Sequence, residues 1–228
     1  MTASSSIIVA KNSGFCFGVK RAADSIEAKL DCAVPGERIY TLGKLIHNDT
    51  YNSYLASRGV GVLDESEIEA VAGSANAESP VTLFIRAHGV TLGTEELLGR
   101  LSAENRHFKF IDCTCPYVRK VRAVAAGHSG EGKCFILMGN PEHPEVVGIM
   151  SCVEGEKHVF RSSDELEEAL KTGMLGDMHK KTVVIAAQTT FDLSEWRKSL
   201  EKLKKLCTNP IIFDTICGVT ERRQAEAK

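Results

Sequence analysis

Short apolar runs alternate with longer segments of helical composition along the chain. The apolar runs are rich in β-branched side chains, as buried strands are, and they lie at 7–10, 38–42, 81–85, 108–111, 134–138, 182–187 and 211–213. The segments of helical composition lie at 19–30, 94–103, 117–126, 163–171 and 193–206. Strands and helices that alternate in this way form parallel sheets covered by helices. The pattern therefore predicts the α/β fold class.

A cysteine follows three of these strands, each time after a short loop and before a helix start that carries basic residues. Cys16 follows the strand at 7–10, while Cys115 and Cys217 each end an Asp-x-x-Cys sequence. The intervals from residue 16 to 115 and from 115 to 217 are 99 and 102 residues, which is about the length of one small domain. We therefore expect three similar α/β units around a pseudo-threefold axis.

The expected units divide the chain at its repeated cysteines. The first unit is predicted at 16–114 and the second at 115–216, and the segments 1–15 and 217–228 are predicted to belong to a third. Because the sequence ends eleven residues after Cys217, most of the third unit is expected to be missing.

Composition and charge argue against a nucleic-acid or membrane partner. The chain is 43% hydrophobic and 25% charged, as globular proteins are, and its formal net charge of -2 lacks the excess of Lys and Arg that nucleic-acid binding needs. The apolar run at 7–10 is too short for a signal peptide or a membrane span. We therefore expect a cytoplasmic protein without a nucleic-acid or membrane partner. In that reducing compartment the eight cysteines are expected to be thiols, some of them metal ligands, rather than disulfides.

The three repeated cysteines are predicted at the carboxyl ends of parallel strands, where functional groups gather in α/β proteins. The positive end of a helix dipole favours a thiolate, which is the form that binds iron or zinc. Three single thiolates from separate units differ from the paired Cys-x-x-Cys ligands of a zinc ribbon. They suit a 4Fe-4S cluster held by Cys16, Cys115 and Cys217, whose fourth iron stays open for a substrate oxygen.

The opposing interpretation treats the cysteines as small buried hydrophobic residues, as most cytosolic cysteines are. The even spacing and the repeated context favour a metal site for the three repeated positions. The cysteines without that context are expected to be packing residues; they are Cys32, Cys134, Cys152 and Cys207. Cys113 lies two positions before Cys115 and stays a competing ligand.

Three loop histidines are also predicted at the carboxyl ends of strands. They are His47, His88 and His143. If their imidazoles converge on one cavity, they could be metal ligands or could donate hydrogen bonds to an anion. The sequence does not decide between these two roles.

The Gln-Thr-Thr sequence at 188–190 follows the strand predicted at 182–187. Its amide and hydroxyl groups could hold a substrate hydroxyl at the same edge of the sheet. Thr190 could also cap the helix predicted at 193–206. Both roles can coexist.

A set of motifs in this order resembles the 4-hydroxy-3-methylbut-2-enyl diphosphate reductase family of the non-mevalonate isoprenoid pathway. The motifs are Gly14-Phe15-Cys16-Phe17-Gly18-Val19, His47-Asn48, Ala87-His88-Gly89-Val90, Thr114-Cys115-Pro116, His143-Pro144-Glu145-Val146, Gln188-Thr189-Thr190 and Thr215-Ile216-Cys217. The resemblance runs from about residue 7 to residue 224. It implies three α/β domains in a trefoil around a 4Fe-4S cluster, and reductive removal of the substrate hydroxyl to give isopentenyl and dimethylallyl diphosphates.

The resemblance also implies roles for single residues. His47, His88 and His143 match the histidines that surround the diphosphate in the family. Glu145 matches the residue that relays protons, and Thr189 matches the threonine near the hydroxyl end of the substrate. Burial that raises the pKa of Glu145 would suit it to proton delivery.

Electrons must come from outside, because the sequence contains no flavin or nicotinamide fingerprint. A ferredoxin or flavodoxin is the implied donor. In the family, the stretch that corresponds to the missing part of the third unit carries serine and asparagine residues that bind the diphosphate. Two alternatives therefore stand beside the reductase: a non-catalytic fragment with the same fold, and a zinc hydrolase that uses His47, His88, His143 and Glu145, in which the cysteine spacing has no role.

Overall fold

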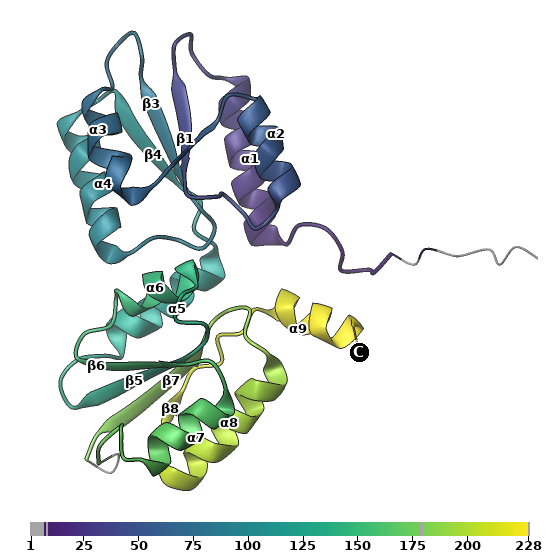
Figure 1. Ribbon diagram of the computed structural model, residues 1–228, viewed down its shortest axis with the longest axis vertical. Coiled ribbons are helices and arrows are strands. Elements are labelled where there is room, and N and C mark those ends of the chain that lie inside the picture. The colour runs from purple at the N-terminus through teal and green to yellow at the C-terminus, as the bar shows by residue number, and fades with distance from the viewer. Residues whose placement is uncertain (1–6, 8, 178–179, 228) are drawn as a thin grey trace, which may run out of the picture.

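The computed structural model describes residues 7, 9–177 and 180–227, and these form two four-stranded parallel sheets (Figure 1). The first sheet has the order β2-β1-β3-β4, with β1 (Arg38–Leu42), β2 (Gly61–Leu63), β3 (Val81–Ile85) and β4 (Phe108–Asp112). The second has the order β6-β5-β7-β8, with β5 (Lys133–Met138), β6 (Glu156–Phe160), β7 (Thr182–Ala187) and β8 (Ile211–Ile212). The α/β prediction is confirmed, and two of the three expected units are present in the described part of the chain.

Helices cover both faces of each sheet (Figure 1). The first sheet is flanked by α1 (Phe17–Asp31), α2 (Asp49–Ser57), the 3-10 turn η1 (Glu65–Glu67), α3 (Ile68–Gly73) and α4 (Leu92–Glu104). The second is flanked by α5 (Pro116–Gly127), α6 (Pro144–Met150), α7 (Ser163–Lys171) and α8 (Leu193–Leu206), and α9 (Gly218–Glu226) follows β8. No helix in the described ranges is long and apolar enough to cross a membrane.

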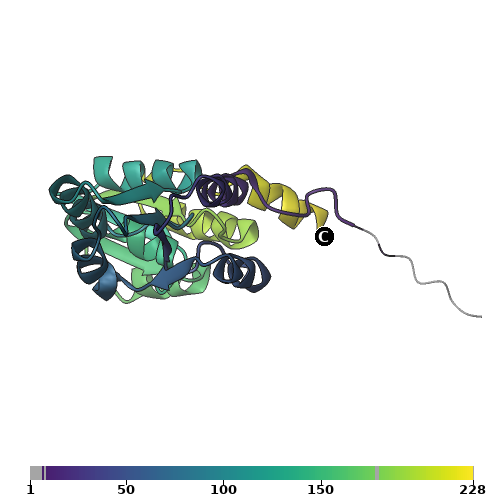
Figure 2. The same ribbon diagram turned by 90° about the horizontal axis from the view of Figure 1, so that it is seen from above.

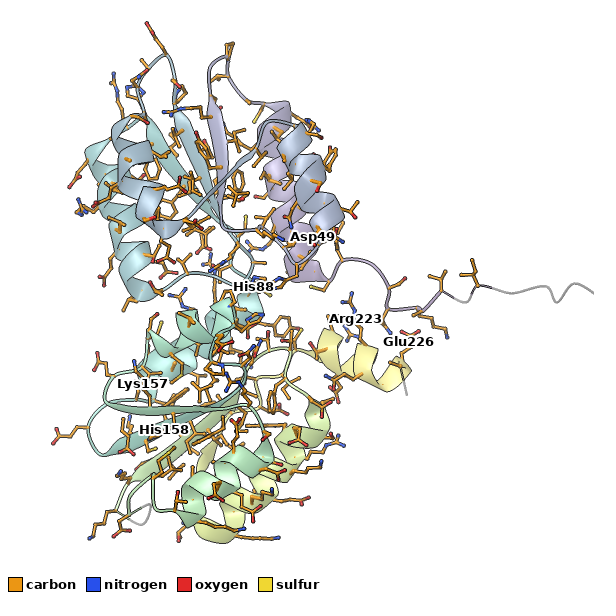
Figure 3. The ribbon with its side chains drawn as sticks, viewed as in Figure 1. Asp49, His88, Lys157, His158, Arg223 and Glu226 are labelled. Atoms are coloured by element: carbon orange, nitrogen blue, oxygen red, sulfur yellow. The ribbon has the colours of Figure 1, made fainter. Side chains whose placement is uncertain are left out.

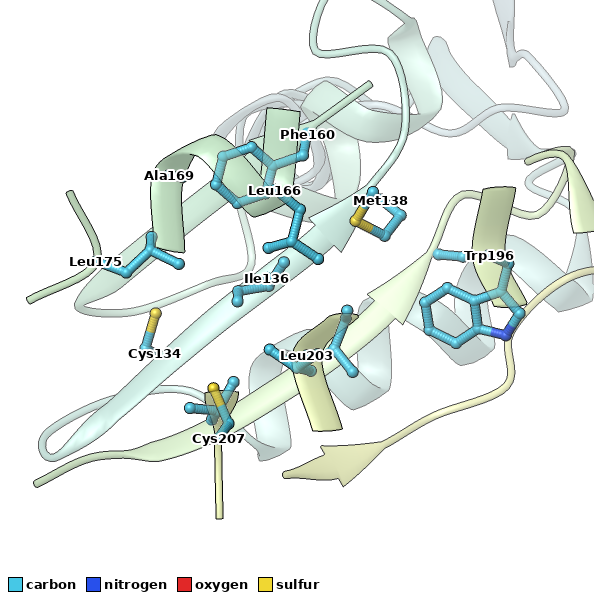
Figure 4. Close-up of a cluster of buried hydrophobic side chains, with 13 residues drawn as sticks. Cys134, Ile136, Met138, Phe160, Leu166, Ala169, Leu175, Trp196, Leu203 and Cys207 are labelled. Atoms are coloured by element: carbon cyan, nitrogen blue, oxygen red, sulfur yellow. The ribbon is translucent and has the colours of Figure 1, made fainter. Parts of the chain in front are cut away.

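The core of each unit consists of two layers, one on each face of the sheet. Along β3, Leu83 and Ile85 pack on the side of α3 and α4, while Phe84 between them packs on the opposite side, against α1 and α2. This alternation follows from the two-residue period of a strand. Because both faces are covered, all five residues of β3 are buried. The second unit repeats the arrangement, and Figure 4 shows its layer under α7 and α8, which includes Trp196.

Polar side chains fix several helix starts. Asn48 accepts a hydrogen bond from the backbone N–H of Tyr51 at the start of α2, and Asp192 accepts two at the start of α8. Such bonds satisfy N–H groups that have no partner within the helix. The expectation that Thr190 caps the helix was wrong, because Asp192 lies directly before it.

The strand expected at 7–10 is absent from the described residues of that segment. Ile7, Val9 and Ala10 have no regular structure, residue 8 lies outside the described residues, and the Ile7 and Val9 side chains are 92% and 73% exposed. The apolar sequence has no neighbouring strand here to pair with. Residues 11–14 instead contact α9, which lies beside the start of α1 in both ribbon views (Figures 1 and 2).

Candidate active site

Helix starts and loops from both units line one cavity of ≈ 210 Å³. Its walls include the repeated cysteines and several of the other predicted site residues: Cys16, His88, Cys115, Glu145, Thr189, Thr190 and Cys217. His88 lies between the two sheets in Figure 3, where Arg223 marks the α9 side of the region. The structure therefore brings together residues that are up to two hundred positions apart in the sequence.

Each repeated cysteine is the residue directly before a helix. Cys16 precedes α1, Cys115 precedes α5 and Cys217 precedes α9, and none of the three side chains forms a capping hydrogen bond. Their sulfur atoms are thus available for other ligation, at helix ends where the dipole favours negative charge. Pro116 occupies the first turn of α5, where a missing N–H costs no helical hydrogen bond.

The three thiols are close enough to influence one another. Burial raises the pKa of the Cys115 thiol, and the neighbouring Cys16 and Cys217 raise it further. The backbone N–H groups of Tyr117 and Val118 act in the opposite direction, because they favour the thiolate. A multinuclear metal centre would relieve the repulsion between three thiolates by placing positive charge among them.

Gly18 makes room for the Cys115 sulfur. A Cβ atom built on Gly18 would lie 2.5 Å from Cys115 Sγ and 3.2 Å from Cys115 Cβ. No side chain larger than a hydrogen fits at this contact between α1 and the start of α5 unless the sulfur moves.

The remaining cysteines lie away from the cavity wall. Cys113 is only 1% exposed and belongs to the hydrophobic layer under α1 and α2. Cys134 and Cys207 are buried and Cys152 is half-buried, and all three pack against hydrophobic clusters, so their predicted packing role is confirmed. The expectation for Cys32 was wrong, because this residue is exposed at the end of α1.

The three predicted histidines form a compact group. The ring centroids of His47 and His88 are 4.4 Å apart, those of His88 and His143 are 5.2 Å apart, and those of His47 and His143 are 5.5 Å apart. His47 is exposed, while the other two are half-buried. The Nδ1 atom of His143 accepts a hydrogen bond from the backbone N–H of Glu145, so its proton is on Nε2 when the ring is neutral.

The surroundings of His88 and His143 favour the neutral form of their imidazoles. Burial lowers the pKa of His88 to about 3, and positive charge on the neighbouring histidines and on Arg86 adds to the effect. Burial also lowers the pKa of His143. His88 Nδ1 is buried and has no hydrogen-bond partner in the described structure. A group of this kind gains stability when an anion with acceptor oxygens enters it.

Within the described residues, both carboxylate oxygens of Glu145 accept hydrogen bonds from Thr189. Its side chain is buried, Oε1 accepts a hydrogen bond from the backbone N–H of Thr189 at 2.7 Å, and Oε2 accepts one from Thr189 Oγ1 at 2.9 Å. Burial raises the pKa of the Glu145 carboxyl, although both bonds from Thr189 oppose the shift. Because both carboxylate oxygens are engaged with Thr189, the geometry gives no support to Glu145 as a partner of the histidines in a zinc site.

Two residues near the site were missed by the sequence-based prediction. Arg86 is one of them, and its positive charge adds to the lowering of the pKa of His88 and of His143 by burial. Thr215 Oγ1 accepts a hydrogen bond from the backbone N–H of Ala187 at 2.8 Å and donates one to the carbonyl of the same residue. Thr215 thereby ties the segment before Cys217 to the end of β7. The signal that could have identified it is its place two residues before a repeated cysteine.

Known proteins are similar to this chain in both sequence and fold. The family model "LytB protein" matches residues 7–228. The 4-hydroxy-3-methylbut-2-enyl diphosphate reductase of Thermoanaerobacter sp. (strain X514) is 34% identical over 221 residues, which are 97% of this chain and 70% of that protein. The protein of the same name from Clostridium tetani (strain Massachusetts / E88) is also 34% identical, and the match covers 98% of this chain and 32% of that longer protein.

Two solved structures have the same fold. A structure of (E)-4-hydroxy-3-methyl-but-2-enyl diphosphate reductase, the terminal enzyme of the non-mevalonate pathway, matches with a TM-score of 0.71 and 32% identity and covers 96% of this chain and 71% of its own. The E-1-hydroxy-2-methyl-but-2-enyl-4-diphosphate reductase from Plasmodium falciparum matches with a TM-score of 0.75 and 25% identity, over 93% of this chain and 61% of its own. The chain spans about a third to about 70% of the length of these relatives. On the evidence of a family match that extends over nearly all its residues, the chain belongs to the LytB protein family.

Proposed function

We propose that this chain is an iron-sulfur reductase that converts 4-hydroxy-3-methylbut-2-enyl diphosphate to isopentenyl and dimethylallyl diphosphates. The observation that carries the proposal is the cavity in which Cys16, Cys115 and Cys217 meet Glu145 and Thr189. Relatives of this chain carry the reductase name. The units proposed to build the site are 16–114 and 115–216, and the segments 1–15 and 217–228 belong to a third.

The three cysteines fit a 4Fe-4S cluster. Their thiols line one cavity, come from three separate helix starts and form no capping bonds, and Gly18 leaves room for the Cys115 sulfur. A cluster held in this way would supply single electrons and one Lewis-acidic iron without a protein ligand.

The histidines suit the diphosphate end of the substrate. The rings of His47, His88 and His143 lie within one small region, and each ring can donate a hydrogen bond from an N–H group to a phosphate oxygen. Arg86 adds a fixed positive charge beside them. A diphosphate would accept hydrogen bonds from the half-buried His88 and His143, where such bonds are stronger than in bulk water.

Glu145 suits the delivery of protons. Burial raises the pKa of the Glu145 carboxyl, which is the direction that suits a proton donor, and Thr189 Oγ1 lies within hydrogen-bond distance of it. The overall reaction takes two electrons and two protons: the allylic C–O bond breaks, the hydroxyl leaves as water, and a carbon of the allyl group gains a C–H bond. Ferredoxin or flavodoxin is the proposed one-electron donor. The free thiols in the described structure suit a cytoplasmic location.

The test is turnover after anaerobic reconstitution with iron and sulfide. Dithionite and a mediator dye supply electrons, and chromatography separates the two C5 diphosphate products. Wild-type protein should form both products, and Cys115→Ser should form neither, because one cluster ligand is lost. Cys152→Ser is the matched control, since Cys152 is also half-buried but lies outside the cavity. Product formation by Cys115→Ser at the wild-type rate would refute the proposed site.

A further inference from the structure

A second group of side chains of the types that bind metal ions lies at the amino end of the second sheet, away from the active-site cavity. It consists of Cys134, near the start of β5, with Glu156 and His158 on the neighbouring strand β6. Figure 3 shows His158 on β6, far from His88, and Figure 4 shows Cys134 at the start of β5. None of the three lines the cavity that contains the repeated cysteines.

The strand register explains why the three side chains meet. Cys134 is directly paired with Glu156 across the parallel ladder of β5 and β6. His158 lies two residues beyond Glu156, and alternate residues of a strand point to the same face. The Cys134 sulfur, a Glu156 oxygen and a His158 nitrogen all lie within 4.8 Å of one another. His158 Nε2 is 3.3 Å from Glu156 Oε1.

One side of this group is buried in the hydrophobic core, and the other side is open to solvent. Cys134 is 0% exposed within the hydrophobic cluster under α7 and α8, whereas the side chains of Glu156 and His158 are 32% and 22% exposed. A cation can therefore enter from solvent, and water can fill a fourth position. A thiolate, an imidazole and a carboxylate together are a donor set that zinc accepts at tetrahedral sites.

A positive charge already occupies one side of this group. The Lys181 ammonium lies 2.5 Å from Glu156 Oε2. It also donates a hydrogen bond to the carbonyl of Leu175 at 3.1 Å, so it keeps a partner if it leaves the carboxylate. From this arrangement we propose that Cys134, Glu156 and His158 bind one divalent cation of the zinc type, and that Lys181 competes with the cation for Glu156.

The first test counts zinc sites in the purified full chain by competition with a chromogenic chelator. His158→Gln should bind one tight equivalent fewer than wild type, with an affinity at this site at least about tenfold weaker, because even the outer partners of metal ligands are worth ~10–100-fold in affinity. His107→Gln is the matched control, since His107 is also half-buried but lies elsewhere. Equal numbers of zinc equivalents with equal affinities in wild type and His158→Gln would overturn the proposal.

Two further measurements separate a metal site from a purely structural ion pair. Lys181→Met should bind zinc more tightly than wild type, because the competing ammonium is gone; an unchanged affinity would contradict the proposed location. X-ray absorption at the zinc edge, with one equivalent of zinc on wild-type protein, should show a single sulfur ligand. Three sulfur ligands would place the metal at the repeated cysteines instead, and no sulfur ligand would place it at the histidines of the active site. Neither measurement requires truncation of the buried Cys134 side chain.

Discussion

Replacement of Gly18 by alanine tests the contact that positions a proposed cluster ligand. Alanine usually stabilises a helix relative to glycine, by up to ~1 kcal/mol. At Gly18 the added Cβ would lie 2.5 Å from Cys115 Sγ, whereas real Cβ atoms essentially never come within 3.0 Å of another heavy atom. The sulfur would have to move by at least about 0.5 Å to restore a permitted contact. We therefore expect the substitution to destabilise the protein rather than stabilise it.

The magnitude follows from the balance of the two effects. An extra carbon forced into a packed contact costs about 1–3 kcal/mol, which exceeds the propensity gain. Gly93 is the matched control, because it is also the second residue of a helix and a Cβ added there would have nothing within 4 Å. Gly93→Ala should therefore show only the gain in helix stability that alanine gives over glycine. The two variants should therefore differ by about 1–3 kcal/mol in the free energy of unfolding, with Gly18→Ala the less stable.

Urea unfolding of both variants measures this difference, and iron content after anaerobic reconstitution reports on the ligand itself. Gly18→Ala should bind less iron than wild type, because the displaced Cys115 sulfur no longer matches the other two thiols. Gly93→Ala should bind as much iron as wild type. If Gly18→Ala is as stable as Gly93→Ala and retains its full iron content, the contact does not constrain Cys115 and the reasoning fails.

Three further predictions concern the same cavity. Glu145→Gln should keep the visible spectrum of the cluster but lower turnover by ~10²–10⁴-fold, on the scale of lost general-acid catalysis; an unchanged rate would remove Glu145 from proton delivery. Cys115→Ser should lose iron and Cys113→Ser should retain it, because Cys113 is buried in a hydrophobic layer, and the reverse iron contents would contradict the assignment. The pKa of His88 is lowered to about 3 from 6.5, so the unfolded chain binds more protons between these values and stability should fall as the pH falls through this window. Urea titrations should show a shallower pH dependence for His88→Asn, and identical slopes would refute this role.

The buried strands were predictable because parallel strands covered on both faces are continuous apolar runs. The segment at 81–85 is such a run, and it is β3 in the structure. The edge strands β2 and β6 were missed, since β2 has only three residues and β6 begins with Glu156, Lys157 and His158. Their exposed sides need no apolar side chains, so composition alone does not reveal them.

The site was predictable where a local pattern repeats and unpredictable where the contacts are distant. The even spacing of the repeated cysteines identified three residues that the structure places around one cavity. The bonds between Glu145 and Thr189 join residues 44 positions apart on different elements, and no spacing in the sequence indicates them. The strand predicted at 7–10 shows that local composition alone can also mislead. Local composition there favours a strand, but a strand also needs a neighbour for its hydrogen bonds.

Backbone hydrogen bonds explain why Cys115 and Cys217 occupy equivalent positions in the two units. The N–H of Cys115 donates to the carbonyl of Ala87, just beyond β3, and the N–H of Cys217 donates to the carbonyl of Thr189, just beyond β7, each at 2.9 Å. Because β3 and β7 occupy the same place in their sheets, the same bond sets the start of the following helix in both units. Cys115 and Cys217 are thereby each fixed to the carboxyl edge of the sheet that precedes them. The two cysteines meet in space because both sheets present their carboxyl edges to one cavity.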